Sequence, residues 1–319
     1  MEKRIMAHRP KFFMMVGLPA SGKSTEAKIL SQLYCAEIFS SDEIRKELFN
    51  DVSNQDNNEE VFKTLHLRVK ECLAKGKNCI YDATNINWKR RKAFLTEINK
   101  YNPEKIAIVC ALPVAYCVER NNKRETRVPK EVIKRMYYNF TIPYWYEGWD
   151  DICVLYTSAF GKEHKYKTEG FIEGQWHSDQ NNSHHELTLG KHCLYTALWA
   201  NKFYNNIFKG YGTPYRNTPL YFAACLHDLG KVSTKTYVNK RGETTEDAHY
   251  YNHQNVGCYN SLFFDFEGIN PIDVAVLILW HMQPYFNKEE KTRLKYENLW
   301  KPELTKLIYI LHEADMEAH

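Results

Sequence analysis

The sequence lacks the features of a secreted or membrane-spanning protein. No apolar run approaches the roughly 20 residues that a membrane helix needs, and the start, MEKRIMAHRPKFFMMVG, has neither the long apolar core nor the small-residue cleavage site of a signal peptide. The nine cysteines are odd in number and never spaced CxxC, so they support neither a disulfide framework nor a cysteine zinc site. We therefore expect a cytoplasmic protein with reduced thiols and no membrane partner.

The composition is otherwise that of an ordinary globular protein, with 44% hydrophobic and 26% charged residues and a formal net charge of +4. A length of 319 residues is enough for two domains, each with its own core. Histidine is unevenly distributed, because only His8 and His66 of the 13 histidines precede residue 164. This asymmetry indicates that the two halves carry different chemistry.

The pattern of apolar residues changes near residue 160. Strand-like runs at 11–17, 78–85, 105–113 and 151–158 alternate with helical stretches at 59–75, 87–100 and 129–140, which is typical of a parallel α/β sheet. Beyond a polar, aperiodic stretch at 159–183, the apolar spacing is helical. We predict an α/β domain over residues 1–160, a linker over 161–180 and an all-α domain over 181–319.

A phosphate-binding motif follows the first predicted strand. GLPASGKST satisfies the pattern GxxxxGK[ST] between a strand and a helix. The glycines let backbone N–H groups converge on phosphate oxygens, Lys23 supplies a cation for the β and γ phosphates, and the Ser24 hydroxyl can hold Mg²⁺. The predicted ATP-binding residues are Gly17, Ala20, Ser21, Gly22, Lys23, Ser24 and Thr25.

The segment FSSDEIRKEL offers a candidate site for the phosphate acceptor. Asp42 and Arg45 lie one helical turn apart at a predicted helix start. The carboxylate could accept a proton from an attacking hydroxyl, and the guanidinium could hold an acceptor phosphate. Ser40 and Glu43 also form a capping-box pattern. The two interpretations are compatible, because a cap would fix the helix that presents Asp42.

Two further segments carry polar residues where a kinase would need them. YDATN places Asp82, Thr84 and Asn85 at the carboxyl end of a predicted strand, where α/β sheets bind ligands. ERNNKRETRVP supplies Arg120 and Arg124, which we expect to share one helical face and to close over a transferring phosphoryl group as a lid. A solvated basic helix face is the alternative for these arginines.

The second half spaces its imidazoles and carboxylates widely. The set is His192, His227, Asp228, His253, His281 and Asp315. Successive members are separated by about one helix and a connection, so five helices could direct these side chains into one core. Mixed imidazole and carboxylate ligands suit a divalent metal of octahedral preference better than a structural zinc. Taken singly, each histidine is as readily explained as a hydrogen-bonded core residue.

The order of the motifs in the first half resembles that of the 5′-hydroxyl polynucleotide kinases of the phage RNA-repair type. GLPASGKST, SSDEIR, DATN and RNNKR occur in this order over some 130 residues. The resemblance implies ATP and Mg²⁺ groups at Lys23 and Ser24, a general base at Asp42, a ligand of the acceptor's 3′ phosphate at Arg45, and lid arginines at Arg120 and Arg124. It also implies that Asp82, Thr84 and Asn85 shape the acceptor site.

The second half resembles the HD-domain phosphohydrolases, especially the HD module found beside tRNA nucleotidyltransferases. The likeness covers residues 184–319 and includes LHDLGK. It implies one metal on His192, His227, Asp228 and Asp315, a second metal near His253 and His281, and a phosphate contact at Lys231. The expected metal is Mn²⁺, Ni²⁺, Co²⁺ or Fe²⁺. His249, placed one helical turn before His253, and the pair His184 and His185 receive no role.

Together these resemblances imply a bifunctional enzyme that heals nucleic-acid ends, with RNA favoured over DNA. The first domain would phosphorylate a 5′-OH with ATP, and the second would hydrolyse a 2′,3′-cyclic or 3′-terminal phosphate. A separate RNA ligase would be a partner. Two alternatives stay open at this point: a small-molecule or nucleotide kinase fused to an HD nucleotidase, and a nucleotide-sensing regulator whose HD module is not catalytic.

Overall fold

The chain divides into two compact units. The computed structural model describes residues 9–50, 57–156, 165–183, 186–208 and 213–318, so His184 and His185 lie outside the described residues. The first unit comprises Met1–Met136 and Pro143–Gly161, and the second comprises Tyr137–Ile142 and Lys162–His319. Among the described residues, no helix combines the length and the apolar character needed to cross a membrane.

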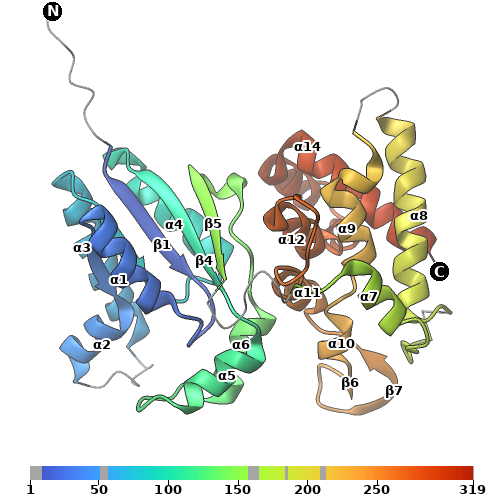
Figure 1. Cartoon of the computed structure of the whole chain (residues 1–319), viewed down its shortest axis with the longest axis horizontal. Helices are drawn as coiled ribbons and strands as arrows, with labels where there is room; N and C mark the ends of the chain where they lie inside the picture. The colour runs from blue at the N-terminus through green and yellow to red at the C-terminus, as the bar shows by residue number, and fades with distance from the viewer. Residues whose placement is uncertain (1–8, 51–56, 157–164, 184–185, 209–212, 319) are drawn as a thin grey trace, which may run out of the picture. The chain divides into compact units, whose positions relative to one another are not determined.

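The first unit is built on a five-stranded parallel sheet (Figure 1), which confirms the predicted α/β class. The strands are β1 (Lys11–Val16), β2 (Glu37–Ser40), β3 (Cys79–Asp82), β4 (Glu104–Ala111) and β5 (Asp151–Tyr156). Their order across the sheet is β2-β3-β1-β4-β5. Because β1 lies between β3 and β4, the carboxyl ends of β1 and β3 meet at one edge of the sheet, where such sheets bind ligands.

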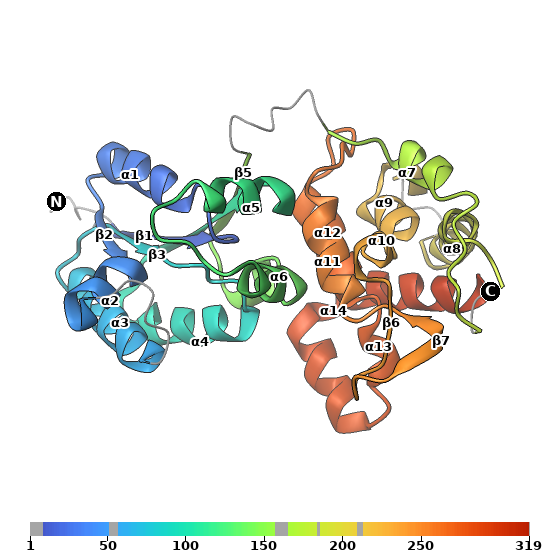
Figure 2. The ribbon, with the colours of Figure 1, turned by 90° about the horizontal axis from the view of Figure 1, so that it is seen from below.

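Helices cover both faces of this sheet. They are α1 (Lys23–Tyr34), α2 (Ser41–Phe49), α3 (Asn58–Ala74), α4 (Trp88–Ile98), α5 (Val114–Asn122) and α6 (Lys130–Tyr138), with short 3₁₀ turns at Asn99–Tyr101 and Trp145–Glu147. Figure 2 shows α1 on one side of the sheet and α3 and α4 on the other. The last two residues of α6 belong to the second unit.

Alternation along β1 explains why both faces of the sheet are buried. Phe13 and Met15 pack with Ala27 of α1 on one face. Phe12 points to the other face, where its ring lies 5.8 Å from that of Phe94 of α4. Successive side chains of a strand point to opposite faces, and a parallel sheet covered by helices on both faces buries both sets. The sheet is therefore the centre of the core of the first unit.

A buried ion pair fixes the loop after β3. Arg91 of α4 bonds Glu147 through Nε at 2.8 Å and through Nη2 at 2.7 Å, and both side chains are at most 1% exposed. Arg91 Nη1 also donates to the carbonyl of Asn85 at 2.8 Å. Glu147 accepts a further hydrogen bond from the indole of Trp149. The pair therefore ties α4 and the 145–147 turn to the segment that carries the predicted acceptor-site residues.

The second unit is mostly helical. Its helices are α7 (Thr168–Gly174), α8 (Leu189–Ile207), α9 (Pro219–Leu226), α10 (Lys231–Thr234), α11 (His253–Ser261), α12 (Pro271–Trp280), α13 (Gln283–Phe286) and α14 (Glu290–Glu317), with a 3₁₀ turn at Tyr215–Asn217. Helix α14 is broken at Lys301, whose φ of 70° is not helical and which precedes Pro302. The helix α7 lies inside the segment that the sequence pattern indicated as a linker.

A small antiparallel hairpin interrupts the helices, so the second unit is not purely α. Its strands are β6 (Thr236–Val238) and β7 (Thr244–His249), with Thr236 opposite His249. Gly242, at a φ of 86°, supplies the left-handed residue that the connecting turn needs. The strand β6 has only three residues, too few for an alternating pattern to be recognised in the sequence.

Two glycines let the turn after α9 approach α11 backbone to backbone. A Cβ atom on Gly230 would lie 1.9 Å from the carbonyl oxygen of His253, and one on Gly257 would lie 3.2 Å from the nitrogen of Gly230. No side chain fits at Gly230 without moving α11. This close approach brings the turn containing His227 and Asp228 to the start of α11.

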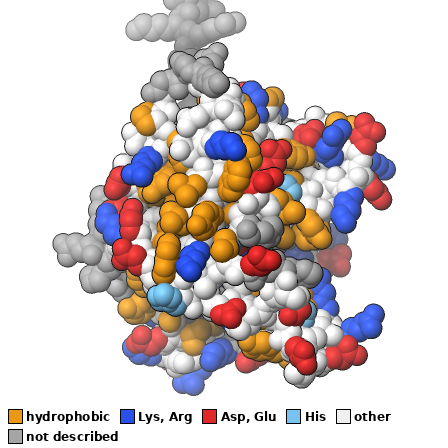
Figure 3. Space-filling view, turned by 90° about the vertical axis from the view of Figure 1, so that its right-hand side faces the viewer, with side chains coloured by type: hydrophobic (Ala, Val, Ile, Leu, Met, Phe, Trp, Pro, Cys, Tyr) orange, Lys and Arg blue, Asp and Glu red, His pale blue; other side chains and the backbone are white. Residues whose placement is uncertain are grey.

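Helix α8 has an apolar outer face. Tyr195, Leu198 and Ile207 are each about half exposed, whereas His192 on the same helix is buried. The side of the molecule seen in Figure 3 carries several exposed apolar side chains. Cys193, Thr196 and Ala197 continue the buried face of α8, whereas Tyr195 and Leu198 are exposed. The outer stripe therefore takes no part in the polar cluster of this unit.

Replacing Glu147 by Gln is expected to destabilise the first unit by about 3–5 kcal/mol, because Arg91 would keep its charge without a buried partner. Glu97 offers a matched control, since it pairs with Lys70 at 3.0 Å while 48% of its own side chain is exposed. Glu97→Gln is expected to cost less than about 1 kcal/mol. Denaturant unfolding measures both changes, and equal costs would contradict this role of Glu147.

Candidate active sites

The GLPASGKST segment forms a phosphate-binding loop between β1 and α1. A Cβ atom on Gly17 would lie 2.8 Å from the backbone oxygen of Cys110, so only glycine fits there. Gly22, at a φ of 104°, is the residue before the first turn of α1 and adopts a left-handed conformation that favours glycine. The loop therefore places the first turn of α1 at the carboxyl edge of the sheet. Backbone N–H groups at the start of a helix can bind phosphate.

Lys23 and Ser24 both lie beside Asp82 at the end of β3. The Lys23 ammonium is buried and donates to the carbonyl of Leu18 at 2.8 Å, and the Ser24 hydroxyl donates to Asp82 Oδ2 at 2.8 Å. Burial lowers the pKa of Lys23, and Asp82 opposes that shift. A hydroxyl and a carboxylate side by side are oxygen ligands of the kind that Mg²⁺ takes in P-loop proteins. Asp82 is thus placed at the phosphate loop.

Thr84 and Asn85 support the loop through backbone contacts. Gly17 N donates to the Thr84 carbonyl at 3.0 Å, and Asn85 Nδ2 donates to the carbonyl of Met15 at 2.8 Å. Asn85 has a φ of 46°, a conformation that asparagine tolerates better than most residues. The Asn85 side chain therefore holds the end of β1.

Asp42 and Arg45 form an ion pair on the first turn of α2, after β2. Arg45 Nη1 lies 2.9 Å from Asp42 Oδ1, and Arg45 Nη2 donates to Asn58 Oδ1 at 2.9 Å. Exposure differs sharply, because 66% of the Asp42 side chain is accessible against 6% for Arg45. Ser40 caps the helix by accepting from the Asp42 N–H. The helix cap and the Asp42–Arg45 pair therefore coexist, with only the carboxylate open to solvent.

The prediction that Arg120 and Arg124 share a helical face is wrong. Helix α5 ends at Asn122, so Arg120 lies in its last turn and Arg124 lies beyond it. The buried side chain of Asn121 causes this ending: it accepts from Val128 N at 3.0 Å and donates to Val128 O at 2.8 Å. These two bonds close a loop over residues 122–127, which carries exposed arginines, Arg124 among them.

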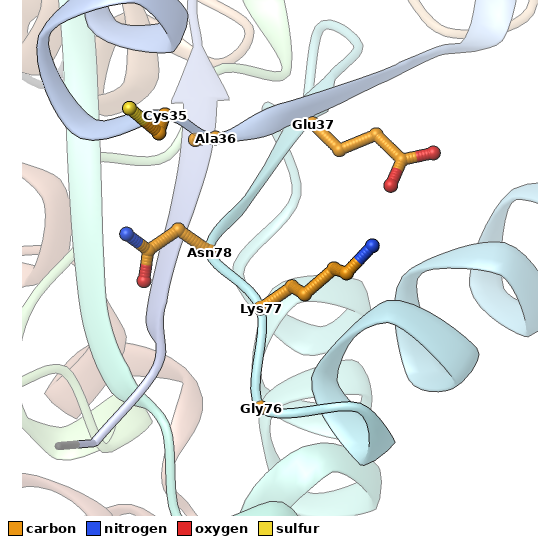
Figure 4. Close-up of a pocket in the computed structure, with 6 residues that line it drawn as sticks. All are labelled: Cys35, Ala36, Glu37, Gly76, Lys77 and Asn78. Carbon is orange, nitrogen blue, oxygen red and sulfur yellow. The ribbon is translucent and has the colours of Figure 1, made fainter.

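A surface pocket lies at the opposite edge of the sheet from the phosphate loop. It is lined by Cys35, Ala36, Glu37, Gly76, Lys77 and Asn78, at the amino ends of β2 and β3 (Figure 4). None of the predicted site residues lines it. The pocket therefore has no part in the candidate kinase site.

The predicted metal-binding residues of the second unit come together. His192 lies on α8, His227 follows α9, His253 begins α11, His281 follows α12, and Asp315 lies near the end of α14. Asp315 Oδ1 lies 3.0 Å from His192 Nε2 and 3.2 Å from His227 Nε2. His253 Nε2 and His281 Nε2 are 3.2 Å apart. Helix ends therefore supply most of this cluster.

Each of the four imidazoles is fixed by a hydrogen bond at Nδ1. The acceptors are the carbonyls of Ala318 for His192, Ala224 for His227, Tyr250 for His253 and Ile278 for His281, at 2.7–3.0 Å. A carbonyl can only accept, so Nδ1 carries the proton and Nε2 of the neutral ring presents a lone pair. His192 Nε2 and His227 Nε2 are 3.1 Å apart. Two lone pairs repel at this distance, so a proton or a metal cation must lie between the two nitrogens.

Asp228 joins two groups of metal-ligating atoms. His192, His227 and Asp228 form one group, and Asp228, His253 and His281 form the other. Asp228 Oδ2 lies 3.4 Å from both His192 Nε2 and His227 Nε2, and Oδ1 lies 3.3 Å from His253 Nε2. The two oxygens thus face different imidazoles, and Asp228 together with these imidazoles could hold a divalent metal.

The electrostatics of this cluster also favour a cation. Burial alone would lower the pKa of His227, but the charges of Asp228 and Asp315 outweigh it and raise that pKa to about 10. Burial holds the pKa of His281 at about 3. For Asp315, burial would raise the pKa, yet His227 and His192 hold it well below its usual range. Two ionised carboxylates in this cluster need positive charge close by, which Lys231, a protonated His227 or a divalent metal would supply.

Lys231 lies at the cluster, whereas His249 is not where the sequence suggested. The Lys231 ammonium lies 2.7 Å from Asp228 Oδ2 and is buried, so it touches the cluster itself. His249 ends β7 and does not lie on a helical turn before His253, and its Nε2 lies 3.0 Å from the hydroxyl of Thr245. The reason is the hairpin, which the sequence pattern did not reveal. His249 therefore lies outside the cluster.

The sequence did not predict three residues that hold other side chains or loops in place. Asn58 holds Arg45, and Asn121 closes the arginine loop. Gln180, 2% exposed, bonds Lys231 at 2.7 Å from within the predicted linker. Each is one of several polar residues in a polar stretch, so the sequence does not distinguish it from its neighbours. The one sequence signal for Gln180 was its place in a segment rich in Ser, Asn and Asp, whose side chains commonly hydrogen-bond the backbone.

Comparison with known proteins places the first unit. Residues 12–143 match the model of a family described as an AAA domain. A curated relative, the L-seryl-tRNA(Sec) kinase of Methanococcus maripaludis, is 29% identical over 154 residues, which are 44% of this chain and 57% of that protein. The chain thus spans little more than half the length of this relative. The first unit is a P-loop α/β domain similar in sequence to a kinase.

Three solved structures each resemble less than half of the chain. A putative kinase from Chloroflexus aurantiacus matches with a TM-score of 0.40 and 18% identity, over 47% of this chain and 86% of that one. A chain of the Pnkp1/Rnl/Hen1 RNA repair complex matches with a TM-score of 0.38 and 27% identity, over 43% and 45%. Kti12 of Chaetomium thermophilum matches with a TM-score of 0.40 and 16% identity, over 48% and 92%.

Asp228→Ala and Asp228→Asn are both expected to strip divalent metal from the second unit, because a neutral side chain cannot supply the negative charge that a hard divalent cation needs. The measurement is elemental analysis after loading the full chain with Mn²⁺. His249→Ala is the control, since this nearby histidine lies outside the cluster, and it should keep wild-type metal content. Full occupancy in Asp228→Asn would show that the residue is held only by structural hydrogen bonds.

Proposed function

We propose that this chain is a bifunctional nucleic-acid end-healing enzyme. The first unit phosphorylates a 5′-OH end with ATP and Mg²⁺, and the second hydrolyses a 2′,3′-cyclic or 3′-terminal phosphate with a divalent transition metal. The healed ends, a 5′ phosphate and a 3′ hydroxyl, are what a separate RNA ligase would consume. We favour RNA over DNA, because the curated relative is named for a kinase whose acceptor is a charged tRNA.

The kinase proposal rests on the ion pair at the start of α2. Asp42 is open to solvent and is oriented by the buried Arg45, and its charge acts on both Lys23 and Asp82. A carboxylate so placed can accept the proton of an attacking hydroxyl. Ser24 and Asp82 would hold Mg²⁺, which supplies charge neutralisation at the phosphates. Lys23 and the arginines of the 119–127 segment stabilise the transferring phosphoryl group.

The hydrolase proposal rests on the convergent Nε2 atoms and on Asp228. The residues His192, His227, Asp228, His253, His281 and Asp315 would hold the metal. A bound divalent metal supplies Lewis-acid chemistry at a phosphoester. The chain itself contributes the Lys231 ammonium beside Asp228, a cation able to attract a phosphate oxygen.

A small-molecule or nucleotide kinase fused to an HD nucleotidase is the alternative. A phosphate loop, a general base and arginines over the phosphoryl group do not by themselves determine whether the acceptor is a polynucleotide or a nucleoside. Labelled ATP with 5′-OH RNA, 5′-OH DNA and free nucleosides as competing acceptors separates these cases. Preferential labelling of free nucleosides would overturn the polynucleotide assignment and leave the kinase assignment intact.

Lys23→Ala and Asp42→Ala are each expected to lower 5′ phosphorylation by at least about 100-fold, because one removes electrostatic stabilisation and the other removes the proton acceptor. Phosphoesterase turnover, measured on the same preparations, should be unchanged. Glu43→Ala is the control, since Glu43 is an exposed acid on the same turn of α2. Near-wild-type kinase turnover in Asp42→Ala would show that Asp42 is not the general base and that the segment only caps α2.

Arg45→Ala is expected to lower kcat by about 10- to 100-fold for acceptors with and without a 3′ phosphate, because the lost charge-assisted bond no longer orients Asp42. Steady-state kinetics with the two acceptors tests this. An increase in KM confined to the 3′-phosphorylated acceptor would instead assign Arg45 to the acceptor phosphate, the role that the sequence suggested.

A further inference from the structure

Residues 178–183, which we call the strap, are fixed to the second unit. Ala248 N donates to the Asn181 carbonyl at 2.7 Å, and Asn182 Nδ2 donates to the Ala248 carbonyl at 2.8 Å. The Ser183 hydroxyl bonds Asp247 at 2.8 Å. The strap therefore runs beside β7, although its sequence is that of a linker.

The strap places one buried amide at the metal cluster. Gln180 is 2% exposed, and its Nε2 donates to the Leu187 carbonyl at 3.0 Å. Its Oε1 accepts from Lys231 Nζ at 2.7 Å, and the Tyr250 hydroxyl donates to its backbone carbonyl. Because a carbonyl can accept only from the NH₂ end of the amide, Oε1 is the atom that faces Lys231.

Lys231 is held from two sides. Its ammonium lies 2.7 Å from Gln180 Oε1 and 2.7 Å from Asp228 Oδ2, and it lies 5.3 Å from the ring centroid of Tyr250. An ammonium on a four-carbon stem is a flexible point charge, so one contact alone would not fix it. The amide orients it without cancelling its charge, which a carboxylate at position 180 would do.

We propose that Gln180 is a positioning residue of the phosphoesterase centre, where its amide oxygen holds the Lys231 ammonium beside Asp228 to receive a phosphate oxygen of the substrate. The proposal rests on the proposed phosphoesterase function. It makes the strap part of that site. A merely structural hydrogen bond would instead affect folding alone, with no link to phosphate.

The test uses inorganic phosphate as the probe and the full chain loaded with Mn²⁺. Titration calorimetry gives the phosphate Kd for wild type, Gln180→Leu, Lys231→Met and the double variant. Gln180→Leu should weaken phosphate binding about tenfold, the usual weight of one such hydrogen bond. In the Lys231→Met background the same change should have no further effect, because the residues act as one unit. Metal content should stay at the wild-type value.

Two further variants keep the test decisive. Gln180→Glu has nearly the same shape and should fold, and its charge on Lys231 should also weaken phosphate binding. Gln283→Leu is the control, because the Gln283 amide donates to Asn287, the residue that follows α13, and this variant should bind phosphate as wild type does. Unchanged affinity in both Gln180 variants, additive losses in the double variant, or no phosphate binding by wild type would overturn the proposal.

Measuring phosphoester hydrolysis distinguishes failure of the Gln180 proposal from failure of the proposed phosphoesterase function. If metal-loaded wild type hydrolyses 2′,3′-cyclic phosphate ends, Gln180→Leu should raise KM more than it lowers kcat. If wild type binds phosphate through Gln180 and Lys231 yet hydrolyses no phosphoester, the phosphoesterase function fails while the positioning role of Gln180 stands.

Discussion

Hydrogen bonds from four imidazole Nδ1 atoms to backbone carbonyls are the constraint on which the second unit depends. Each bond sets a tautomer and aims an Nε2 lone pair inward, so the cluster is unfavourable without positive charge at its centre. Three of the carbonyls lie three residues before their own histidines, and the fourth, Ala318, follows α14 and holds His192 of α8, so helix packing and ligand orientation are set together. Gly230 contributes by letting the turn with Asp228 approach α11.

Both candidate sites contain an acidic and a basic residue three positions apart, but the two pairs differ in exposure. In Asp42 and Arg45 the base is buried and the acid is open to solvent, whereas Asp228 and Lys231 are both buried. An exposed carboxylate oriented by a buried cation suits exchange of a proton with an incoming hydroxyl. A fully buried carboxylate needs several cationic partners at once. The same local spacing thus serves two different chemistries.

The sequence predicted what depends on local pattern. The long strands, the phosphate loop and the set from His192 to Asp315 follow from periodicity, glycine placement and spacing. Two short strands were not predicted: β6 has three residues, too few to show a period, and the four residues of β2 run directly into α2. Arg124 was misplaced because Asn121 ends the helix through Val128. Gln180 could not be found, since its partner Lys231 lies 51 residues away in the chain.

The path of the chain limits how the two units can be separated. It leaves the first unit at Tyr137, returns at Pro143 and leaves again at Lys162. The Phe140 ring lies 4.8 Å from that of Tyr259, and Asn255 donates to the Phe140 carbonyl at 2.9 Å. If the chain were divided near residue 160, residues 137–142 would stay with the first unit, and Tyr259 of the second unit would lose its contact with Phe140. A single break in the chain therefore cannot release either unit intact.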